Sequence, residues 1–238
     1  MQKIFRGDIT SSKVKRRISH EKIIAVDGPA GAGKSTVSKI VAARLGYTYI
    51  DTGAMYRAVA LKCNEELGIR NEELTEELIV KVASDIDIKL DEAARVFLDG
   101  REVTKEIRTP EVSRGASDVA KVGFVRKKLT ELQRAMAAQG SVIMDGRDIG
   151  TQVLPNADLK IFLTASVEER ARRRFEELKS KGFAADFAQI QKEISLRDKQ
   201  DSEREIAPLA KAEDAVLLDT THLTIEQVVE EILRLAQA

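Results

Sequence analysis

The chain has 238 residues, of which 43% are hydrophobic and 33% charged, a composition typical of one large α/β domain with a full core. Its formal net charge is zero, so we expect no nucleic-acid partner. No apolar run reaches the roughly 18 residues that a membrane span needs. The lone cysteine, Cys63, excludes an intrachain disulfide and fits a reducing compartment. Because no secretory signal is evident either, we expect a cytoplasmic protein.

Residues 1–21 form a basic segment that we expect to be a disordered extension. Six Lys or Arg residues and Asp8 within residues 1–20 give a net charge of +5, which leaves −5 for the rest of the chain. Such a segment can contact phosphates or anionic lipid, but a plain extension is the simpler interpretation. We assign it no function and expect residues 22–238 to form a single domain.

The predicted domain begins with alternating strands and helices. We expect strands at Ile23–Asp27 and Tyr47–Asp51, each followed by a helix, at Lys34–Leu45 and Ala54–Leu67. Strands and helices that alternate with short links predict a parallel sheet with helices on both faces. The sequence therefore favours the α/β class.

The segment 68–108 interrupts this alternation. A helix is predicted at Glu72–Ala83, and three short strand-like runs follow it: Asp85–Leu90, Arg95–Leu98 and Arg101–Val103. Asp99-Gly100, between the last two runs, suits a hairpin turn. We therefore predict an inserted subdomain with a small antiparallel sheet.

The alternation then resumes and continues to the end of the chain. Strands are predicted at Ser141–Asp145, Leu159–Thr164 and Ala215–Asp219. The predicted helices run from Thr109-Pro110 to about Lys121, over Phe124–Gln139, from the capping box that begins at Ser166, over Phe187–Lys199 and over Ile225–Ala236.

A phosphate-loop motif lies between the first strand and the first helix. Gly28–Ser35 read GPAGAGKS, which is G-x-x-x-x-G-K-[ST] in the strand–turn–helix setting that the motif requires. Glycines let backbone N–H groups surround an anion, and the helix N-terminus adds its positive dipole end. Lys34 supplies a charge for the outer phosphates, and the Ser35 hydroxyl can ligate Mg²⁺. The residues expected to bind a nucleoside triphosphate are Gly28, Pro29, Ala30, Gly31, Ala32, Gly33, Lys34, Ser35 and Thr36.

Two further motifs carry arginine at the carboxyl ends of predicted strands, where parallel sheets bind ligands. DTGAMYR contains Thr52 and Arg57, and DGRDIG contains Arg147 and Asp148. Asp145 ends its strand where a phosphate-loop protein needs a carboxylate near Mg²⁺. Two alternatives to ligand binding stay open. The first motif can serve only to cap a helix, and the second can be a salt-bridged loop that contacts no ligand.

The third arginine-rich segment is the predicted helix SVEERARRRFEELKSKG, with SLRDKQDSERE after it. Pairs at spacing four, such as Glu169 with Arg173, explain much of its composition as a solvated helix. Four arginines within five residues equally suit bidentate phosphate recognition, and both interpretations stay open. Arg197, Asp201 and Arg204 recur at spacings of four and three, so they share one helical face or its continuation.

A phosphate loop together with convergent arginines favours phosphoryl transfer to an acceptor that is itself a phosphate. Such an acceptor oxygen is largely deprotonated at pH 7, so no general base is needed, and we interpret His20 and His222 as surface residues. The chain also lacks the Asn-Lys-x-Asp base reader of guanine switches. A kinase for another small acceptor, such as shikimate, and a slowly hydrolysing switch are the alternatives.

Six motifs together resemble bacterial cytidylate kinases over the chain from Ile23 to its end: GPAGAGKST, YIDTGAMYRA, EIRTPEVS, MDGRDIGT, KIFLTASVEERARRR and KQDSEREIAPL. The resemblance implies a cytoplasmic monomer that transfers phosphate from ATP to CMP or dCMP with Mg²⁺. It also implies a nucleoside-monophosphate-kinase fold: a CORE with the phosphate-loop parallel sheet, an enlarged NMP-binding part at about 68–108 and a helical LID at about 170–187.

The resemblance assigns contacts with the acceptor nucleotide to nine residues. The phosphate clamp falls on Arg57, Arg147 and Arg204, cytosine recognition on Ser117, Arg126 and Asp148, and ribose contacts on Arg197 and Asp201, with Thr52 near the nucleotide. From the residues alone, Ser117 is a helix-surface serine. The carboxylate of Asp148 suits the exocyclic amino group of cytosine, which is a hydrogen-bond donor.

The resemblance also assigns the residues that act on the transferred phosphate. Arg170 and Arg174 are the LID residues expected to reach the ATP phosphates on closure. Catalysis is then expected from Lys34, Arg147, Arg170 and Arg174, and Mg²⁺ binding from Ser35 and Asp145.

Overall fold

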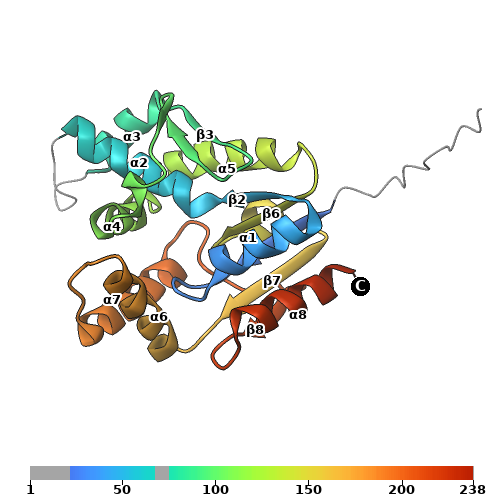
Figure 1. Ribbon diagram of the computed structural model, residues 1–238. Coiled ribbons are helices and arrows are strands. Elements are labelled where there is room, and N and C mark those ends of the chain that lie inside the picture. Colours follow the sequence, from blue (N-terminus) through green and yellow to red (C-terminus); the bar gives the residue numbers. More distant parts are fainter. Residues whose placement is uncertain (1–21, 68–74, 238) are drawn as a thin grey trace, which may run out of the picture.

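The computed structural model describes residues 22–67 and 75–237, and these contain a five-stranded parallel sheet with the order β2-β6-β1-β7-β8 (Figure 1). The five strands are β1 (Ile23–Asp27), β2 (Thr48–Asp51), β6 (Val142–Gly146), β7 (Leu159–Thr164) and β8 (Val216–Asp219). All four neighbouring pairs are parallel. The predicted α/β class is confirmed.

The central strand β1 is buried on both faces, and successive side chains contact different layers, as the period of two in a strand requires. Val26 packs in a core with α1 (Lys34–Leu45) and α8 (Ile225–Gln237), which lie side by side on one face. Ala25 packs on the other face, in a core that includes the end of α5 (Gly123–Ala137). Helices therefore cover both faces of the sheet.

A second core lies above the sheet in Figure 1 and contains the small antiparallel sheet β3-β4-β5. Its elements are α2 (Thr52–Leu67), α3 (Glu76–Ser84), β3 (Ile88–Leu90), β4 (Val96–Leu98), β5 (Arg101–Glu102), a 3₁₀ turn (Glu106–Arg108), α4 (Pro110–Val119) and α5. The buried cluster joins the small sheet to α2, α4 and α5. The predicted insert is thus packed onto helices that precede and follow it.

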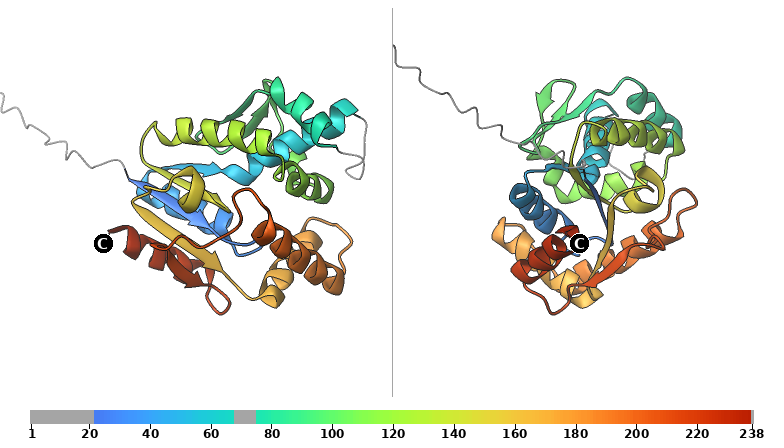
Figure 2. Two further views of the ribbon diagram at one scale, coloured as in Figure 1. Left: turned by 180° about the vertical axis from the view of Figure 1, so that it is seen from behind. Right: turned by 90° about the vertical axis from the view of Figure 1, so that its right-hand side faces the viewer.

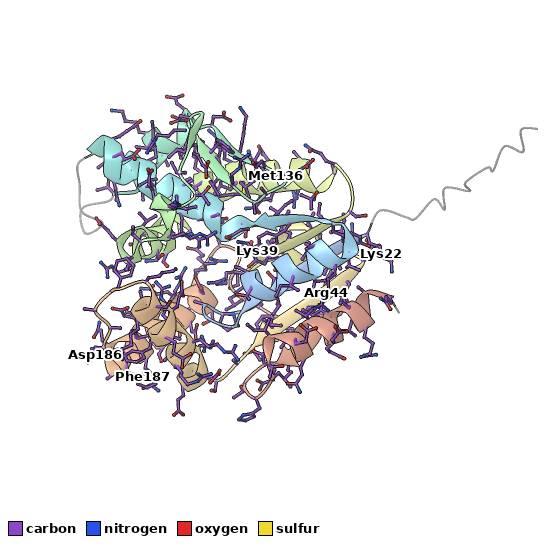
Figure 3. All side chains as sticks on the ribbon, in the orientation of Figure 1. Lys22, Lys39, Arg44, Met136, Asp186 and Phe187 are labelled. Carbon is purple, nitrogen blue, oxygen red and sulfur yellow. The ribbon has the colours of Figure 1, made fainter. Side chains whose placement is uncertain are left out.

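A third, smaller core holds the helical hairpin of α6 (Val167–Ser180) and α7 (Phe187–Glu203). Ile190 and Ile194 of α7 pack against Ala171 of α6. Figure 2 shows this hairpin as a separate projection beside the sheet, and Figure 3 shows Phe187 at its outer end. The hairpin and the α2–α5 part flank the carboxyl end of β1.

The structure moves several predicted boundaries. The helix predicted from Glu72 begins at Glu76, because the Thr75 hydroxyl caps it by accepting a hydrogen bond from Leu78 N. The helix predicted to end at Lys199 continues to Glu203, since no glycine or proline interrupts it.

The predicted loop after β6 contains one π-helical turn, Ile149–Val153. Predictions for residues 1–21 and 68–74 lie outside the described residues. No helix within the described part of the chain is long and apolar enough to span a bilayer.

Candidate active site

The phosphate loop follows β1 directly and packs against the end of β7. At Gly28, a Cβ atom would lie 1.9 Å from the carbonyl oxygen of Leu163, so only glycine fits between the two strands. Gly33 adopts a φ of 93° immediately before α1, which a side chain would strain. The loop therefore brings its backbone to the N-terminus of α1, as an anion site requires.

Lys34, the first residue of α1, points back over the loop. Its ammonium group donates to the carbonyl oxygens of Gly28 at 2.7 Å and Pro29 at 2.8 Å. Burial and the nearby positive charge of Arg147 together lower the pKa of Lys34 to about 7, against the opposing effect of Asp145 and Asp27. A phosphate beside this group would favour its charged form.

Ser35 and Asp145 form the pair expected to hold Mg²⁺. The Ser35 hydroxyl donates to one carboxylate oxygen of Asp145 at 2.7 Å, and the Tyr49 hydroxyl donates to the other at 2.8 Å. Burial raises the pKa of Asp145, and the charge of Asp51 adds to this effect. A cation at this carboxylate would oppose both effects by stabilising the ionised form of Asp145.

The donor set of this pair fits Mg²⁺. One carboxylate and one hydroxyl are oxygen ligands of the kind that Mg²⁺ shares with substrate phosphates and water. The part of the chain that the structure describes holds no group of three or more His, Cys, Asp or Glu that could bind a metal. We therefore expect Ser35 and Asp145 to act together with nucleotide phosphates.

Asp51 ends β2 and anchors two arginines at the mouth of the site. Its carboxylate accepts hydrogen bonds from Arg57 at 3.0 Å, from Arg108 at 2.8 Å and from the N–H of Ala54 at the start of α2. Burial alone would raise the pKa of Asp51, but the two guanidinium groups outweigh it and hold the pKa at about 2. Arg57 is thus oriented by an ionised carboxylate.

Arg147 and Arg197 add positive charge next to Arg57. Arg147 donates to Asp201 on α7 at 2.8 Å. The buried Nε of Arg197 has no hydrogen-bond partner among the described residues. Burial lowers the pKa of Arg197 to about 10, and the charges of Arg147, Arg57 and Arg174 contribute to this. A buried donor without a partner among like charges is typical of an anion site.

Asp148 lies in a buried ion pair with Arg126. Its carboxylate accepts a hydrogen bond of 2.5 Å from Arg126 and lies 3.5 Å from the guanidinium of Arg204. Arg126 also stacks over the ring of Tyr56, at 5.5 Å from its centroid. Arg204 is held in turn by the carbonyl oxygen of Ala207 at 2.6 Å.

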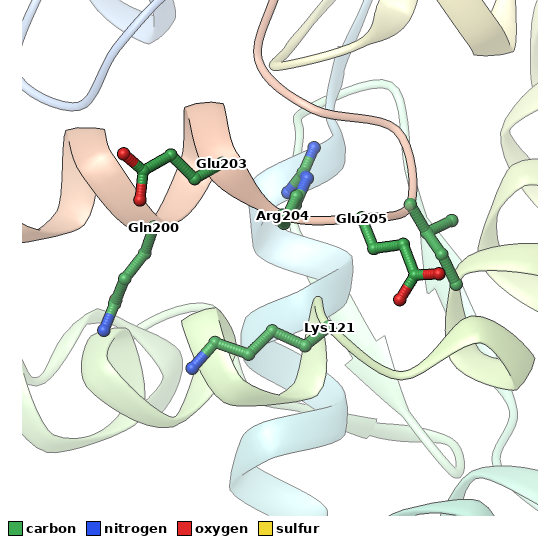
Figure 4. A pocket seen from close by; sticks show the side chains of 6 residues that line it. Lys121, Gln200, Glu203, Arg204 and Glu205 are labelled. Carbon is green, nitrogen blue, oxygen red and sulfur yellow. The ribbon is translucent and has the colours of Figure 1, made fainter.

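A pocket opens beside Arg204, between the end of α7 and the turn after α4 (Figure 4). The residues that line it are Lys121, Gln200, Glu203, Arg204, Glu205 and Ile206. The structure therefore brings Arg126, Asp148 and Arg204 together near one opening. Arg204 also lies 3.9 Å from Asp201, which connects these residues to the group of Arg147, Arg57 and Arg197.

The two predicted LID residues differ in their surroundings. Arg170 is buried in the base of the hairpin, where it donates two hydrogen bonds to Asp198 at 2.9 and 2.6 Å and one to Ala30 O in the phosphate loop at 3.1 Å. Arg174 lies one turn further along α6 and pairs with Glu177 at 2.8 Å. Arg174 is therefore the freer of the two.

Thr52 and Ser117 make no comparable ionic contacts. The Thr52 hydroxyl is buried and donates to the backbone oxygen of Asp145 at 2.7 Å, which ties the start of α2 to β6. Ser117 is half-buried on α4. Their predicted roles toward the nucleotide stay predictions.

Residues 24–238 match the protein family described as Cytidylate kinase. A cytidylate kinase from Caldicellulosiruptor bescii is 56% identical over 213 residues, which cover 89% of this chain and 94% of that protein. The chain belongs to the cytidylate kinase family.

Other members of the cytidylate kinase family match over a similar length. The cytidylate kinase of Exiguobacterium sp. is 54% identical over 90% of this chain and 96% of its own. Among solved structures, shikimate kinase from Acinetobacter baumannii in complex with shikimate has a TM-score of 0.43 at 18% identity and covers 92% of this chain and 94% of that one. The family assignment rests on the sequence relatives.

The structure of this family member also shows contacts beside the phosphate loop that the sequence did not indicate. The carboxylate of Asp27, at the end of β1, accepts hydrogen bonds from the N–H groups of Ile149 at 2.8 Å and Gly150 at 2.7 Å. It thereby holds the backbone of the DGRDIG loop. Burial raises the pKa of Asp27 to about 6, despite these two bonds. Asp27 could have been noticed in the sequence because it is a carboxylate that stands directly between a buried strand and the phosphate loop.

Proposed function

We propose that this chain transfers the γ-phosphoryl group of ATP to CMP or dCMP, with Mg²⁺, as a cytoplasmic monomer. The observation that carries the proposal is that two groups of cationic side chains lie at the carboxyl end of one parallel sheet, and each suits a phosphate. Lys34 and the loop backbone would form the first, and Arg57, Arg147 and Arg204, with Arg197 beside them, would form the second. Membership of the cytidylate kinase family supports cytidine as the acceptor nucleoside.

In the donor half, the loop backbone and Lys34 would bind the phosphates of ATP. Lys34 would exchange its two carbonyl partners for phosphate oxygens, and the negative charge would restore its ordinary protonation. Ser35 and Asp145 would hold Mg²⁺ against these phosphates, and the ion supplies charge neutralisation during transfer. Arg174, on α6, would add charge if the hairpin moved toward the loop.

In the acceptor half, Arg57, Arg147 and Arg204 would clamp the monophosphate, and Arg197 with Asp201 would face the ribose. Asp148 would accept a hydrogen bond from the exocyclic amino group of cytosine, helped by Arg126. Because the attacking phosphate oxygen is already deprotonated near pH 7, these residues need only position it and neutralise charge.

A coupled assay of ADP production tests the proposal with CMP, dCMP, UMP and AMP as acceptors. We expect CMP and dCMP to be turned over much faster than UMP and AMP. If UMP or AMP reacted as fast as CMP, the base assignment would be wrong. ADP production that did not depend on any added monophosphate would contradict the kinase activity itself and favour a slow hydrolase.

A further inference from the structure

The outer side of the phosphate loop, away from α1, is held by an arginine that the proposed function leaves without a role. Arg173, on α6, donates from one terminal nitrogen to Ala32 O in the loop at 3.3 Å and to the Thr220 hydroxyl at 3.1 Å. Its other terminal nitrogen donates to Thr220 O at 2.7 Å, and its Nε donates to Glu169 at 2.8 Å. Every nitrogen of this guanidinium is therefore engaged within the protein.

Thr220 is the second member of this arrangement. It is 2% exposed and follows β8 directly. Its N–H donates to Thr164 O at the end of β7 at 2.8 Å, and its hydroxyl lies 3.0 Å from the same oxygen and 3.4 Å from Ala32 O. Arg173 and Thr220 thus connect the phosphate loop, the end of β7 and the segment after β8.

These contacts orient the amide that follows Ala32. In a trans peptide the carbonyl oxygen and the next N–H point in opposite directions. An Ala32 carbonyl that is held outward by Arg173 therefore directs the Gly33 N–H inward, to the side where α1 begins. Arg170 holds Ala30 O from the same helix at 3.1 Å, which acts in the same way on Gly31.

The loop needs this restraint on its carbonyl groups because its glycines are conformationally free. Gly31 and Gly33 have φ values of 77° and 93°, and glycine alone moves freely between such conformations and others. Without an outer partner for the carbonyls, the intervening peptides would lose part of their orientation before the nucleotide arrives. Pre-oriented N–H donors bind an anion more tightly because less ordering is needed on binding.

Arg172, the neighbour of Arg173 on α6, provides a matched control. It pairs only with Glu169 and Glu176 of its own helix in the described structure, and its side chain is 53% exposed. Among the described residues, it makes no hydrogen bond or ion pair with the phosphate loop. Removing either arginine deletes the same charge from the same helix, but only one of them touches the loop.

We propose that Arg173, seated on Thr220, is a positioning residue that holds the phosphate loop in the conformation that binds the donor nucleotide. The inference rests on the proposed function, since it takes ATP to be the ligand of this loop. It assigns Arg173 no contact with the nucleotide.

The test measures the dissociation constants of Mg·ADP and of CMP by calorimetry on the full chain at 25 °C. We expect Arg173→Ala to weaken Mg·ADP about 10-fold and to change CMP binding less than 2-fold. Arg173→Lys, which keeps one donor group, should fall between Arg173→Ala and the wild type. Arg172→Ala should leave both constants within 2-fold of the wild type. Melting curves verify that each variant is folded at the temperature of measurement.

A second pair of variants tests the contact between Arg173 and the Thr220 hydroxyl. Thr220→Val removes the hydroxyl, whereas Thr220→Ser keeps it. We expect the valine variant to weaken Mg·ADP and the serine variant to retain wild-type affinity. In a double-mutant cycle, Thr220→Val should cost much less in the Arg173→Ala background than in the wild type.

Three results would overturn the inference: unchanged Mg·ADP affinity in Arg173→Ala, equal losses of ADP and CMP affinity, or the same loss in Arg172→Ala. Failure of the proposed function gives a different pattern. In that case the wild type itself would bind no Mg·ADP or would not phosphorylate CMP, whatever residue stands at position 173.

Discussion

The proposed donor and acceptor halves of the site hold their cations in different ways. In the proposed donor half, Lys34 donates only to backbone carbonyl oxygens of the phosphate loop, and Arg173 donates to backbone carbonyls as well as to Glu169. In the acceptor half, arginines pair with carboxylates: Arg57 with Asp51, Arg147 with Asp201, and Arg126 with Asp148. A carbonyl oxygen carries no net charge, whereas a carboxylate cancels the charge of its partner.

This difference gives each half a distinct selectivity. Lys34 forms no ion pair with a carboxylate in the described structure, so its charge can attract a highly charged phosphate chain whatever base is attached. A ligand in the acceptor half must replace buried contacts between opposite charges. A ligand that fits badly leaves buried charges without partners, which costs more than a lost surface contact. We expect discrimination between nucleotides to come mainly from the acceptor half.

The largest expected effect is on the donor half. Lys34→Met removes its central charge but keeps the length of the side chain. We expect kcat/KM for ATP to fall about 1,000-fold, since removal of one group that stabilises developing charge costs about 4 kcal/mol. Steady-state kinetics with CMP at saturation measure this.

Lys39→Met is the control for Lys34, because Lys39 is exposed on the same helix and stacks over Tyr49 (Figure 3). It should change kcat/KM less than 2-fold. A similar loss in both variants would show that total charge on α1 matters rather than the contact of Lys34 with the loop.

A smaller effect, confined to the acceptor half, is expected from Asp148→Ala. The change leaves the guanidinium of Arg126, which is 4% exposed, without its carboxylate. We expect kcat/KM for CMP to fall about 100-fold, about 2.7 kcal/mol, and Mg·ADP affinity to stay within 2-fold. Equal losses for both nucleotides would contradict the separation of the two halves.

Asp87→Ala provides the matched control for Asp148. Asp87 pairs with Lys89 at 2.7 Å, and both side chains are more than half exposed. Surface ion pairs contribute little, so nucleotide affinities should not change.

The smallest expected effect concerns Asp27. This residue ends β1, next to the phosphate loop, but its carboxylate binds the backbone of the DGRDIG loop. Burial raises its folded-state pKa to about 6 from 3.8, so the unfolded chain releases this proton at lower pH than the folded protein does. The ionised form is therefore less favourable in the folded state. Between pH 4 and 7, we expect the wild type to lose about 2 kcal/mol of unfolding free energy relative to Asp27→Asn.

Urea unfolding of both proteins across this pH range measures the difference. The comparison cancels the groups that titrate independently of Asp27. If the free energies of unfolding of the two proteins changed in parallel with pH, Asp27 would have an ordinary pKa in the folded protein.

Much of the fold was predictable because its signals are local. The Gly28–Ser35 motif, the Asp99-Gly100 turn and the Thr109 cap each depend on residues a few positions apart. The strand and helix patterns likewise come from the burial of every second, or every third and fourth, side chain. These features gave the α/β class, the small antiparallel sheet and the site motifs.

The partners of the site residues were not predictable in this way. Asp27 binds the backbone at Ile149 and Gly150, more than 120 positions away, and Arg173 reaches Thr220 across 47. Such contacts depend on β1 lying between β6 and β7, which periodicity along the chain does not specify. The pairing of Arg170 with Asp198 depends similarly on how α6 packs against α7.

The sequence by itself determined a phosphate loop, a set of arginines at strand ends and a relationship to cytidylate kinases. Those properties reside in residue types and short spacings, which act before the chain is packed. Only the tertiary structure decided which cation is held by a carbonyl and which by a carboxylate. That choice depends on the order of strands in the sheet, because it sets which distant oxygen lies within reach of each charged group.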